Sequence, residues 1–396
     1  MKYRCLIIGG GASGLMLAAR LDLKGTAGLV LEKTSRPGTK LLMSGGGRCN
    51  ITHGGSIKDF IGCYGEAGRH LRKCLYRHSN IELASWLEEN GICLADEKGV
   101  PVNSWDISDA GRIFPASMKA SEVLSFLMDR ARQKGWDIRN ESGVCDIQRD
   151  DAGDCWVVRA SPAEEYSAQS LVIASGGITY PETGSDGSVL YLMRNLGVII
   201  SEPRSALAPV YVEDYPYEEL SGISLSDVTV TVADPPGISG EGKTAGRTAS
   251  HSMTGDLLFT HRGFSGPVIL NISRYVRPGS LLKIRYGRAW EDLPKRLQRI
   301  LEKRSRGPSG DIRTTVLASL LASDEFTVIS VDDNGMVTAG GISLDEIDMQ
   351  TMQLKRFPGL YAIGEAIDAD GITGGYNLQM CWSTANTAAD ALSHEQ

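Results

Sequence analysis

The hydrophobic and polar positions at the start of the chain follow the pattern of a strand, a glycine-rich turn and a helix. Residues 4–8 (RCLII) are a short apolar run of the kind that forms a buried parallel strand. The next six residues, 9–14, include four glycines, and the apolar positions of residues 15–21 then suit a packed helix. Residues 28–32 (GLVLE) predict a second strand, so the chain opens with one βαβ unit.

Helical and alternating patterns continue through the first half of the chain. Residues 67–90 and 119–134 predict helices, and a glycine at position 135 ends the second one. Short β-forming runs separated by turn residues predict a meander with strands at 136–148, 154–160 and 166–174. The last of these strands runs into a further pair of glycines.

The alternation of strand and helix signals gives way to mainly β-type runs near residue 190 and resumes after residue 335. Between these points, β-type runs alternate with loops, one amphipathic helix surrounds residues 293–301, and Asp-Asn-Gly at 333–335 predicts a hairpin turn. An apolar strand at 359–365 and a helix at 377–392 then resume the βαβ character. The predicted organisation is one α/β domain, formed by residues 1–190 and 336–396 and interrupted by an insert at residues 191–335.

Composition and charge narrow the classes of protein to consider. The chain has 396 residues, of which 46 are glycines, more than the usual ~7%. Its 41 Lys and Arg against 48 Asp and Glu give a net charge of −7, which argues against a protein that coats nucleic acid. No run of ~20 apolar residues predicts a membrane span. The eight cysteines lack CxxC or metal-ligand spacing, which favours reduced thiols in a cytoplasmic protein without a metal site.

Gly9, Gly11 and Gly14 form the G-x-G-x-x-G pattern that binds dinucleotides. The first glycine allows a tight turn, the second lets the backbone approach a pyrophosphate, and the third lets helix and strand pack closely. The N–H groups at the start of the following helix favour phosphate. Glu32 ends the second strand, where a carboxylate can accept hydrogen bonds from ribose hydroxyls. These positions predict a dinucleotide site without separating FAD from NAD.

Two further glycine-rich segments favour FAD. Residues 38–50 (GTKLLMSGGGRCN) contain three consecutive glycines, with Lys40 and Arg48 as countercharges for a diphosphate. Residues 364–379 (GEAIDADGITGGYNLQ) return late in the chain, and Gly374 and Gly375 stand just before the last predicted helix. Their backbone N–H groups and the helix dipole would stabilise the negative charge that a flavin ring gains on reduction.

These motifs together resemble the BaiN-type family of NAD(P)/FAD-dependent oxidoreductases, which is distantly similar to the flavoprotein subunits of succinate dehydrogenase and fumarate reductase. Matching stretches follow in order from residue 5 to 386 and include IIGGGASGL, GTKLLMSGGGRCN, LVIASGGITYPETGSDG and GLYAIGEAIDADGITGGYNLQMCWSTA. The resemblance implies a Rossmann-like FAD-binding domain with a three-layer ββα sandwich. It also implies that the insert has a small β-barrel part and a helical part.

The resemblance also implies which residues hold FAD. The expected cofactor contacts are Gly9, Gly11, Ala12, Ser13, Gly14, Glu32, Lys33, Lys40, Leu41, Ser44, Gly45, Gly46, Gly47, Arg48, Asn50, Val144, Ala174, Ser175, Gly176, Gly177, Gly364, Glu365, Asp368, Gly374, Gly375, Tyr376, Asn377 and Leu378. NAD(P)H is expected as a transient electron donor. Because the chain has one full G-x-G-x-x-G pattern and no dithiol pair, neither a dedicated Rossmann NAD(P)H domain nor a thiol–disulfide relay is expected.

Five residues are singled out without a firm role. Tyr180 and Tyr376 could donate protons beside the flavin, with ring stacking as the alternative. His261 and Arg262, in the insert, could bind an anionic substrate or stabilise their own loop. Cys49 is interpreted as a small packing residue in preference to a redox thiol. The catalytic acid is therefore left unassigned.

The sequence thus predicts an FAD-dependent oxidoreductase that transfers a hydride to or from a small, largely apolar molecule. The resemblance makes the reduction of a conjugated C=C bond the expected reaction, in a pocket between the FAD domain and the insert. Two alternatives stay open. One is a flavoprotein that modifies or binds nucleic acid, which needs a basic, aromatic-rich insert and conflicts with the acidic total. The other is an FAD-binding redox sensor without turnover.

Overall fold

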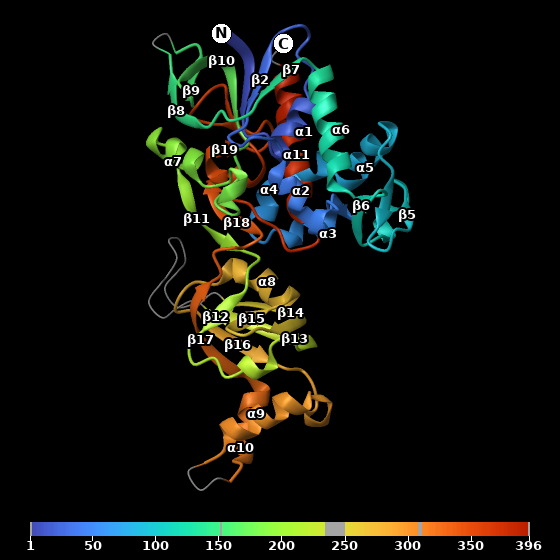
Figure 1. The fold of residues 1–396 in the computed structure, drawn as a ribbon, viewed down its shortest axis with the longest axis vertical. Coiled ribbons are helices and arrows are strands. Elements are labelled where there is room, and N and C mark those ends of the chain that lie inside the picture. Colours follow the sequence, from blue (N-terminus) through green and yellow to red (C-terminus); the bar gives the residue numbers. More distant parts are fainter. Residues whose placement is uncertain (1, 151–152, 234–249, 308–310, 395–396) are drawn as a thin grey trace. The chain divides into compact units, whose positions relative to one another are not determined.

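The chain folds into two compact units (Figure 1). The computed structural model describes residues 2–150, 153–233, 250–307 and 311–394. Unit 1 comprises Met1–Arg204 and Val337–Gln396, and unit 2 comprises Ser205–Met336. The first boundary lies later than the predicted 190/191, because α7 (Ser188–Asn195) and most of β11 (Ile200–Ala206) belong to unit 1, where β11 pairs with β18 (Val337–Ile342).

A nine-stranded sheet forms the centre of unit 1. Its strands are β1 (Lys2–Ile8), β2 (Gly28–Leu31), β7 (Trp136–Arg139), β8 (Val144–Arg149), β9 (Trp156–Ala160), β10 (Glu164–Ile173), β19 (Ile347–Asp348), β20 (Gln353–Leu354) and β21 (Leu360–Ala362). β1 pairs in parallel with β2 and β10, and β21 pairs in parallel with β10. The first half of β10 pairs antiparallel with β9, so the predicted meander continues the main sheet.

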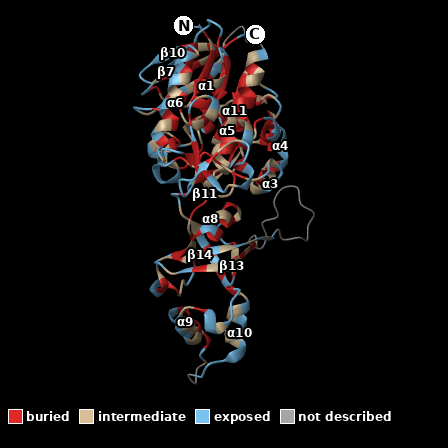
Figure 2. Ribbon diagram, turned by 90° about the vertical axis from the view of Figure 1, so that its right-hand side faces the viewer, coloured by how far each residue is buried: buried red, intermediate tan, exposed pale blue. Residues whose placement is uncertain are grey.

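The helices of unit 1 bury their apolar faces against this sheet and against one another. They are α1 (Ala12–Arg20), α2 (Thr39–Met43), α3 (Ile57–Cys63), α4 (Ala67–Arg77), α5 (Asn80–Glu89), α6 (Ala120–Gln133), α7 and α11 (Tyr376–His394). Buried residues run along α1 and α11, which pack together (Figure 2). The helix predicted over 67–90 is two helices, because the Ser79 side chain accepts a hydrogen bond from the Glu82 N–H (3.2 Å) and starts α5.

A small antiparallel sheet lies beside these helices in unit 1. Its order is β3-β6-β4-β5, and its strands are β3 (Thr52–His53), β4 (Leu94–Asp96), β5 (Pro101–Val102) and β6 (Arg112–Pro115). β3 follows directly after the glycine-rich residues 38–50. The small sheet therefore supports the chain where the second predicted cofactor segment ends.

In its described residues, unit 2 forms a closed six-stranded barrel with three α-helices. The strands are β12 (Val210–Val212), β13 (Ser224–Ala233), β14 (Ser250–Phe259), β15 (Gly263–Ser265), β16 (Leu281–Arg285) and β17 (Asp324–Val331), and the helices are α8 (Pro267–Ile272), α9 (Lys295–Ser305) and α10 (Thr314–Ala322). Val228, Val230 and Val232 alternate into its core, as the period of a half-buried strand requires. The parallel sheet and the barrel-and-helix insert confirm the predicted α/β fold class.

The predicted hairpin at 333–335 is wrong. β17 pairs with β12 and β16, whereas β18 pairs with β11, so the two strands that flank the turn belong to different sheets. The Asn334 N–H donates to the Asp332 carboxylate (2.8 Å), and the Gly335 N–H donates to the Ser205 hydroxyl (2.9 Å). These local bonds stabilise the turn without requiring its flanking strands to pair.

Candidate dinucleotide site

The turn between β1 and α1 has the geometry of a phosphate-binding turn. A Cβ on Gly14 would lie 2.0 Å from the carbonyl oxygen of Gly9, so only glycine lets α1 pack this closely on the turn. Gly9 has a φ of +107° and abuts Ala174 at the end of β10. A Cβ on Gly11, by contrast, would have no described atom within 4 Å. Gly11 is the N-cap of α1 without a side-chain cap, which leaves first-turn N–H groups for a ligand.

Glu32 follows β2 and ties the glycine turn to the end of that strand. Its side chain is buried, and its carboxylate accepts hydrogen bonds from the Gly10 N–H (2.9 Å) and from the N–H and hydroxyl of Thr34 (2.8 and 2.7 Å). The sequence suggested only the ribose contact, and this loop-stabilising role is additional. An ionised carboxylate has about four acceptor positions, so capacity remains for ribose hydroxyls.

Lys33 and Val144 lie next to Glu32 in the structure. The Lys33 ammonium pairs with the Asp186 carboxylate, which the loop before α7 supplies. The Lys33 side chain also passes over Gly143, where a Cβ would be 3.3 Å away, and Val144 then opens β8. Asp186 carries no motif signal, so the sequence did not point to it.

The three consecutive glycines at 45–47 leave bare backbone exposed to solvent. Gly45, Gly46 and Gly47 have φ values of +58°, +67° and +85°, a conformation that L side chains rarely adopt. A Cβ on Gly46 would have no described atom within 4 Å. The glycine-rich segment 38–50, to which these three residues belong, contacts the turn at 9–14, because the Gly38 N–H donates to the Gly10 carbonyl (2.8 Å). The structure therefore places two of the predicted cofactor segments side by side.

Residues on either side of this glycine triplet pack into the protein. Leu41 is buried and accepts the Ser44 hydroxyl at its carbonyl (2.7 Å). The Arg48 guanidinium lies 4.7 Å from the centre of the Phe114 ring. Cys49 is fully buried, and burial raises the pKa of its thiol to about 12, so the thiolate that redox chemistry requires is disfavoured. This supports its interpretation as a packing residue.

Lys40 and Glu365 form an ion pair that joins the second and third glycine-rich segments. The Lys40 ammonium donates to the Glu365 carboxylate (2.7 Å) and to the Thr179 hydroxyl (2.8 Å). Glu365 also accepts a hydrogen bond from the backbone N–H of Thr338 (2.6 Å). Lys40 is thus not the free countercharge that the sequence suggested. Thr179 and Thr338 escaped sequence analysis, because neither belongs to a glycine motif.

The segments that follow β10 and β21 lie next to the glycine turn and the first turn of α1. A Cβ on Gly364 would lie 2.3 Å from the hydroxyl oxygen of Ser13, so this glycine lets the late segment reach the first turn of α1 next to Ala12. A Cβ on Gly177 would lie 2.1 Å from the Thr338 hydroxyl oxygen. The backbone from Ala174 through Ser175 and Gly176 connects these contacts.

Gly375 is required by packing against β3. A Cβ at this position would lie 2.5 Å from the carbonyl oxygen of Thr52. With the Asn50 amide oriented to satisfy its neighbours, its oxygen accepts the Gly375 N–H (3.0 Å) and its nitrogen donates to Thr52 (2.9 Å). This N–H is therefore used within the protein, contrary to the expectation that it points at a flavin. A larger residue at 375 would disturb β3 whether or not a flavin is bound.

Tyr376 lies in an aromatic cluster that the sequence did not reveal. Its ring stacks on His53 (centroids 5.1 Å apart, planes 16° apart), and Phe60 meets its ring edge-on at 5.0 Å. The Tyr64 hydroxyl donates to the Tyr376 carbonyl (2.8 Å). Burial, together with the neighbouring Cys63, raises the pKa of Tyr376, so its hydroxyl stays protonated near neutral pH. The ring contacts hold a protonated phenol in a fixed place.

The remaining predicted residues have structural contacts. The Lys40 ammonium lies 5.6 Å from the centre of the Tyr180 ring. The Asn377 amide folds back on its own loop, accepting the Gly371 N–H (2.8 Å) and donating to the Gly371 carbonyl (3.0 Å). Asp368 is partly buried after β21, and Leu378 packs against the core at the start of α11. Gly374 has a φ of +125° beside the Tyr376 ring.

All the predicted cofactor residues lie in unit 1, whereas His261 and Arg262 lie in unit 2. Both are exposed on the turn between β14 and β15. The Arg262 guanidinium lies 5.5 Å from the centre of the Tyr211 ring, and the Tyr211 hydroxyl donates to Asp332. These contacts support the loop-stabilising alternative for Arg262.

The fold and the glycine turns match those of known proteins. The model of the "HI0933-like protein Rossmann domain" matches residues 3–391. The chain belongs to this family. It is 29% identical over 427 residues to a ribosomal RNA dihydrouridine synthase of Escherichia coli, covering 99% of this chain and 98% of that protein. It is 28% identical over 431 residues to a 3-dehydro-bile acid delta(4,6)-reductase of Clostridium scindens, covering 97% and 98% of the two chains.

A solved structure confirms the fold over the full length. The 3-ketosteroid delta1-dehydrogenase from Sterolibacterium denitrificans superposes with a TM-score of 0.53 at 11% identity and covers 100% of both chains. The family identity confirms the resemblance predicted from the sequence, and the chain is a flavoprotein oxidoreductase with FAD as its cofactor. The open space at Gly11 and Gly46 and the spare acceptor capacity of Glu32 fit that cofactor.

Two expected absences can be compared with the described part of the chain. Within it, no three His, Cys, Asp or Glu side chains gather in a way that could hold a metal ion. None of its helices has the length and apolar character needed to cross a membrane. All eight cysteines are free thiols.

Proposed function

We propose that this protein reduces a C=C bond conjugated to a carbonyl group, and that its substrate is a uracil base within RNA. NAD(P)H is the proposed electron donor. The two curated relatives carry names of one chemical kind, because dihydrouridine is uridine with its ring double bond reduced, and a delta(4,6)-reductase removes double bonds from a 3-oxo ring system. The reaction class follows from what these names share, and the substrate needs a further observation.

The local charge of the insert is the observation that favours RNA. Between Arg274 and Arg313 the sequence has twelve Lys or Arg and only four Asp or Glu, although the chain as a whole has a net charge of −7. A polyanion such as RNA is bound chiefly by cations that contact its phosphates. The sequence-based expectation of no nucleic-acid partner relied on the total charge, in which this basic segment is hidden by acidic residues elsewhere.

The residues of unit 1 fit the part of the reaction that the protein must supply. The glycine turn at 9–14 and Glu32 would hold the dinucleotide, and the backbone at 45–47 would lie along it. Bound FAD would supply hydride-transfer chemistry. The net reaction adds a hydride from NAD(P)H and a proton from an acid to the two carbons of the double bond. Tyr376 is the proposed acid, because a phenol carries a proton at neutral pH and three aromatic rings hold this one in place.

The proposal is tested with the purified, FAD-loaded full chain under anaerobic conditions. The protein is incubated with NADH or NADPH and an unmodified, transcribed ribosomal RNA, which is then digested to nucleosides and analysed by mass spectrometry. We expect dihydrouridine to appear, with one NAD(P)H consumed for each residue formed. Oxidation of NAD(P)H without any dihydrouridine, on RNA both folded and denatured, would contradict the RNA substrate.

A small conjugated enone is the second candidate, because the Clostridium scindens relative is named for such a substrate. A parallel reaction with a 3-oxo-4-ene steroid separates the two. Loss of the enone absorbance, with no dihydrouridine formed on RNA, would select the small molecule.

The role of Tyr376 is tested with Tyr376→Phe, which keeps the ring that stacks on His53. We expect FAD content to be retained and the reduction to slow about tenfold or more, as for the loss of a general acid. The reduction of bound FAD by NAD(P)H should keep its wild-type rate, because that step needs no proton donor to substrate. Slowing of both half-reactions alike would indicate a structural role.

A further inference from the structure

The strongest unexplained feature of unit 2 is one face of α9. We propose that Lys295, Arg296, Arg299 and Lys303, here called the α9 cationic face, dock the phosphate backbone of the RNA substrate. This inference rests on the proposed function and adds to it the surface that recognises the RNA. A run of charged residues on a helix is in the simplest case a solvated face, and the observations below favour a binding surface instead.

The periodicity of α9 separates its two faces. Leu297, Leu301 and Ser305 are buried and recur every four residues, so they form the side that packs on unit 2. At about 100° per residue, the four cations all fall on the opposite side. All four are exposed. Lys295, Arg299 and Lys303 stand one turn apart, at steps of ~6 Å along the helix axis, so the face presents a regular row of charge.

A buried network holds α9 firmly on the barrel. The Arg304 guanidinium turns inward and contacts the Asp324 carboxylate (2.9 Å) and the Tyr217 hydroxyl (2.6 Å). Asp324 is 0% exposed, and the Tyr286 hydroxyl also donates to it (2.8 Å). The one cation of the helix that faces the barrel is thus neutralised by a protein carboxylate. The orientation of the outward face follows from this anchor.

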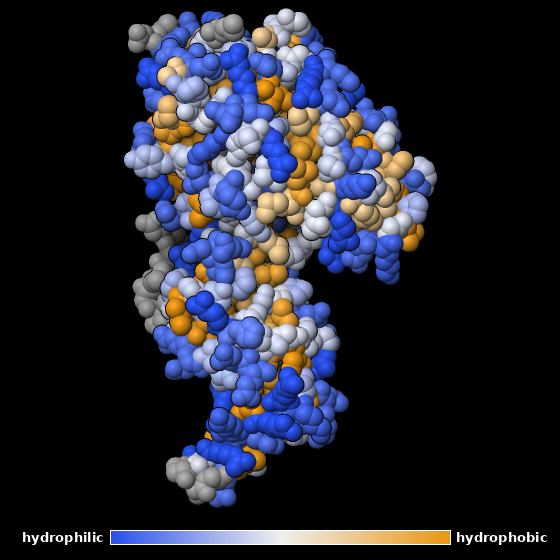
Figure 3. Space-filling view, viewed as in Figure 1, coloured by the Kyte–Doolittle hydropathy of each residue, from blue (hydrophilic) through white to orange (hydrophobic). Residues whose placement is uncertain are grey.

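The outward cations have no such protein partner. In the described ranges, no ion pair joins any of the four to a carboxylate, whereas the nearby Lys283 pairs with Glu325 at 2.8 Å. Further exposed arginines flank the helix, namely Arg285, Arg288, Arg306 and Arg313. Hydrophilic surface gathers over α9 in the space-filling view (Figure 3). The four aligned cations of α9 would release bound counterions when a polyanion replaces those ions, which favours binding to nucleic acid.

The test compares two triple variants of the FAD-loaded full chain that remove the same charges from different helices. Arg296→Gln/Arg299→Gln/Lys303→Gln removes three of the four charges of the α9 cationic face. Arg69→Gln/Arg72→Gln/Lys73→Gln removes two arginines and one lysine from α4 in unit 1, all exposed as well. Glutamine has a helix propensity close to that of arginine and lysine, so both helices should persist. Circular dichroism and FAD absorbance check that each variant folds.

Binding is measured by fluorescence anisotropy on a labelled RNA hairpin with a uridine-rich loop, over a series of salt concentrations. We expect the α9 variant to bind about tenfold or more weakly. The slope of log K against log salt should become shallower by ~2, at about 0.7 per lost phosphate contact to a single strand. The α4 variant should match the wild type. Equal weakening by both variants, or none by the α9 variant, would overturn the proposed docking face.

A second assay distinguishes failure of the docking face from failure of the proposed reaction. The same proteins are assayed for dihydrouridine formation. If RNA binding depends on α9 but the wild type forms no dihydrouridine, the docking face is supported and the proposed reaction is contradicted. If the α9 variant forms dihydrouridine with the wild-type kcat/KM and binds RNA with unchanged affinity, the reaction is supported and the docking face is contradicted.

Discussion

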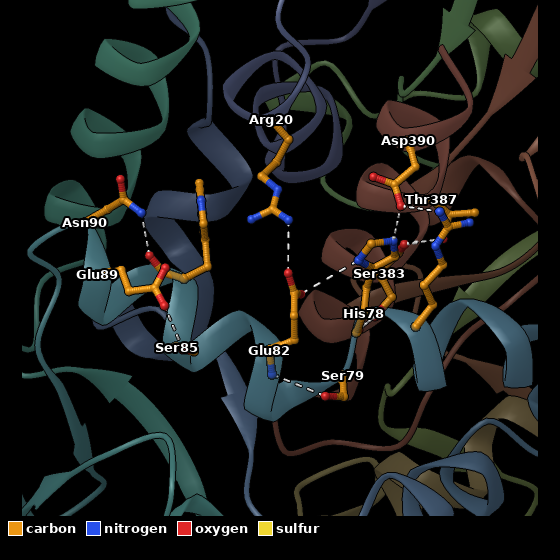
Figure 4. A network of polar contacts seen from close by, with 12 residues as sticks. Arg20, His78, Ser79, Glu82, Ser85, Glu89, Asn90, Ser383, Thr387 and Asp390 are labelled. Atoms are coloured by element: carbon orange, nitrogen blue, oxygen red, sulfur yellow. Dashed lines mark hydrogen bonds and ion pairs between the residues drawn. The ribbon is translucent and has the colours of Figure 1, made fainter. Parts of the chain in front are cut away.

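The two units anchor helices through different buried charged networks, and only the network of unit 1 contains a histidine. In unit 1, His78 lies between Glu82 and Asp390, with its Nε2 3.1 Å from the Asp390 carboxylate, and Arg20 pairs with Glu82 at 2.9 Å (Figure 4). This network joins α5 to α11 and α1. Burial opposes charging of His78, but Asp390 and Glu82 outweigh it, so the pKa of His78 is raised.

In unit 2, the network at the base of α9 consists of Arg304, Asp324, Tyr217 and Tyr286 and contains no histidine. Arg304 is always charged, and burial together with Asp324 raises the pKa of the Tyr217 hydroxyl well above its ordinary value. The same helix-anchoring task is therefore performed without a histidine. A second difference concerns space, because unit 1 leaves glycine backbone open for a ligand at 11 and 46, whereas the barrel of unit 2 is filled by side chains such as Phe259 and Phe264.

Breaking the unit 2 network should have the largest effect on stability. Arg304→Met leaves Asp324 buried without its cation, which should lower the free energy of unfolding by about 3–5 kcal/mol. Urea denaturation followed by tryptophan fluorescence measures this, with Arg299→Met on the exposed face of the same helix as control. A loss of the same size in the control variant would show that the buried pair is not the cause.

Two glycines in one turn of unit 1 should respond differently to the same methyl group. Gly14→Ala places a Cβ 2.0 Å from the Gly9 carbonyl and must shift the turn, so we expect FAD affinity to fall about a hundredfold, ~2.7 kcal/mol. Gly11→Ala meets no described atom within 4 Å, so the apoprotein should lose about 1 kcal/mol of stability or less while FAD binding falls about tenfold.

Fluorescence titration of the two apoproteins with FAD, together with their unfolding curves, measures both quantities. If Gly11→Ala binds FAD as the wild type does, the open space at Gly11 does not receive the cofactor.

Glu32→Gln should have a smaller effect that is divided between folding and cofactor binding. Gly10 donates to one oxygen of the Glu32 carboxylate and Thr34 to the other. Glutamine keeps one acceptor oxygen, and its amide nitrogen cannot accept a hydrogen bond at the other position, so one of the two partners loses its acceptor. We expect the free energy of unfolding to fall by about 1–3 kcal/mol and FAD affinity to fall about tenfold. Glu165→Gln, at an exposed position of β10, is the matched control. Normal stability with weakened FAD binding would remove the loop-stabilising role and leave only the ribose contact.

The smallest expected effect is a pH dependence confined to unit 1. Because the pKa of His78 is raised on folding, the folded chain binds more protons than the unfolded chain. The resulting stabilisation is complete below about pH 6.5, the ordinary histidine pKa, and is lost as the pH rises past the raised value. Unfolding free energies across this window should decline by about 1 kcal/mol in the wild type and stay level in His78→Asn. A parallel decline in both proteins would assign the effect to other groups.

The sequence by itself determined the elements whose signals are local. The βαβ opening, the helix at α6 and the glycine turn at 9–14 follow from periodicity and from backbone conformations that only glycine adopts. The position of Glu32 after β2 follows from the same short-range pattern. These predictions succeed because the interactions that select them lie within a few residues along the chain.

Only the tertiary structure decided which distant groups meet. Lys40 contacts Glu365 across 325 residues, Gly375 is forced by the Thr52 carbonyl, and Tyr376 stacks on His53. The total charge likewise hid the cationic face of α9, because a sum over the chain discards where charges lie. The physical reason is common to the three contacts: contact and burial are set when the chain closes on itself, and residue spacing along the sequence does not carry that information. The positions of the α9 charges, by contrast, stand in the sequence, and the structure adds which of them stay exposed.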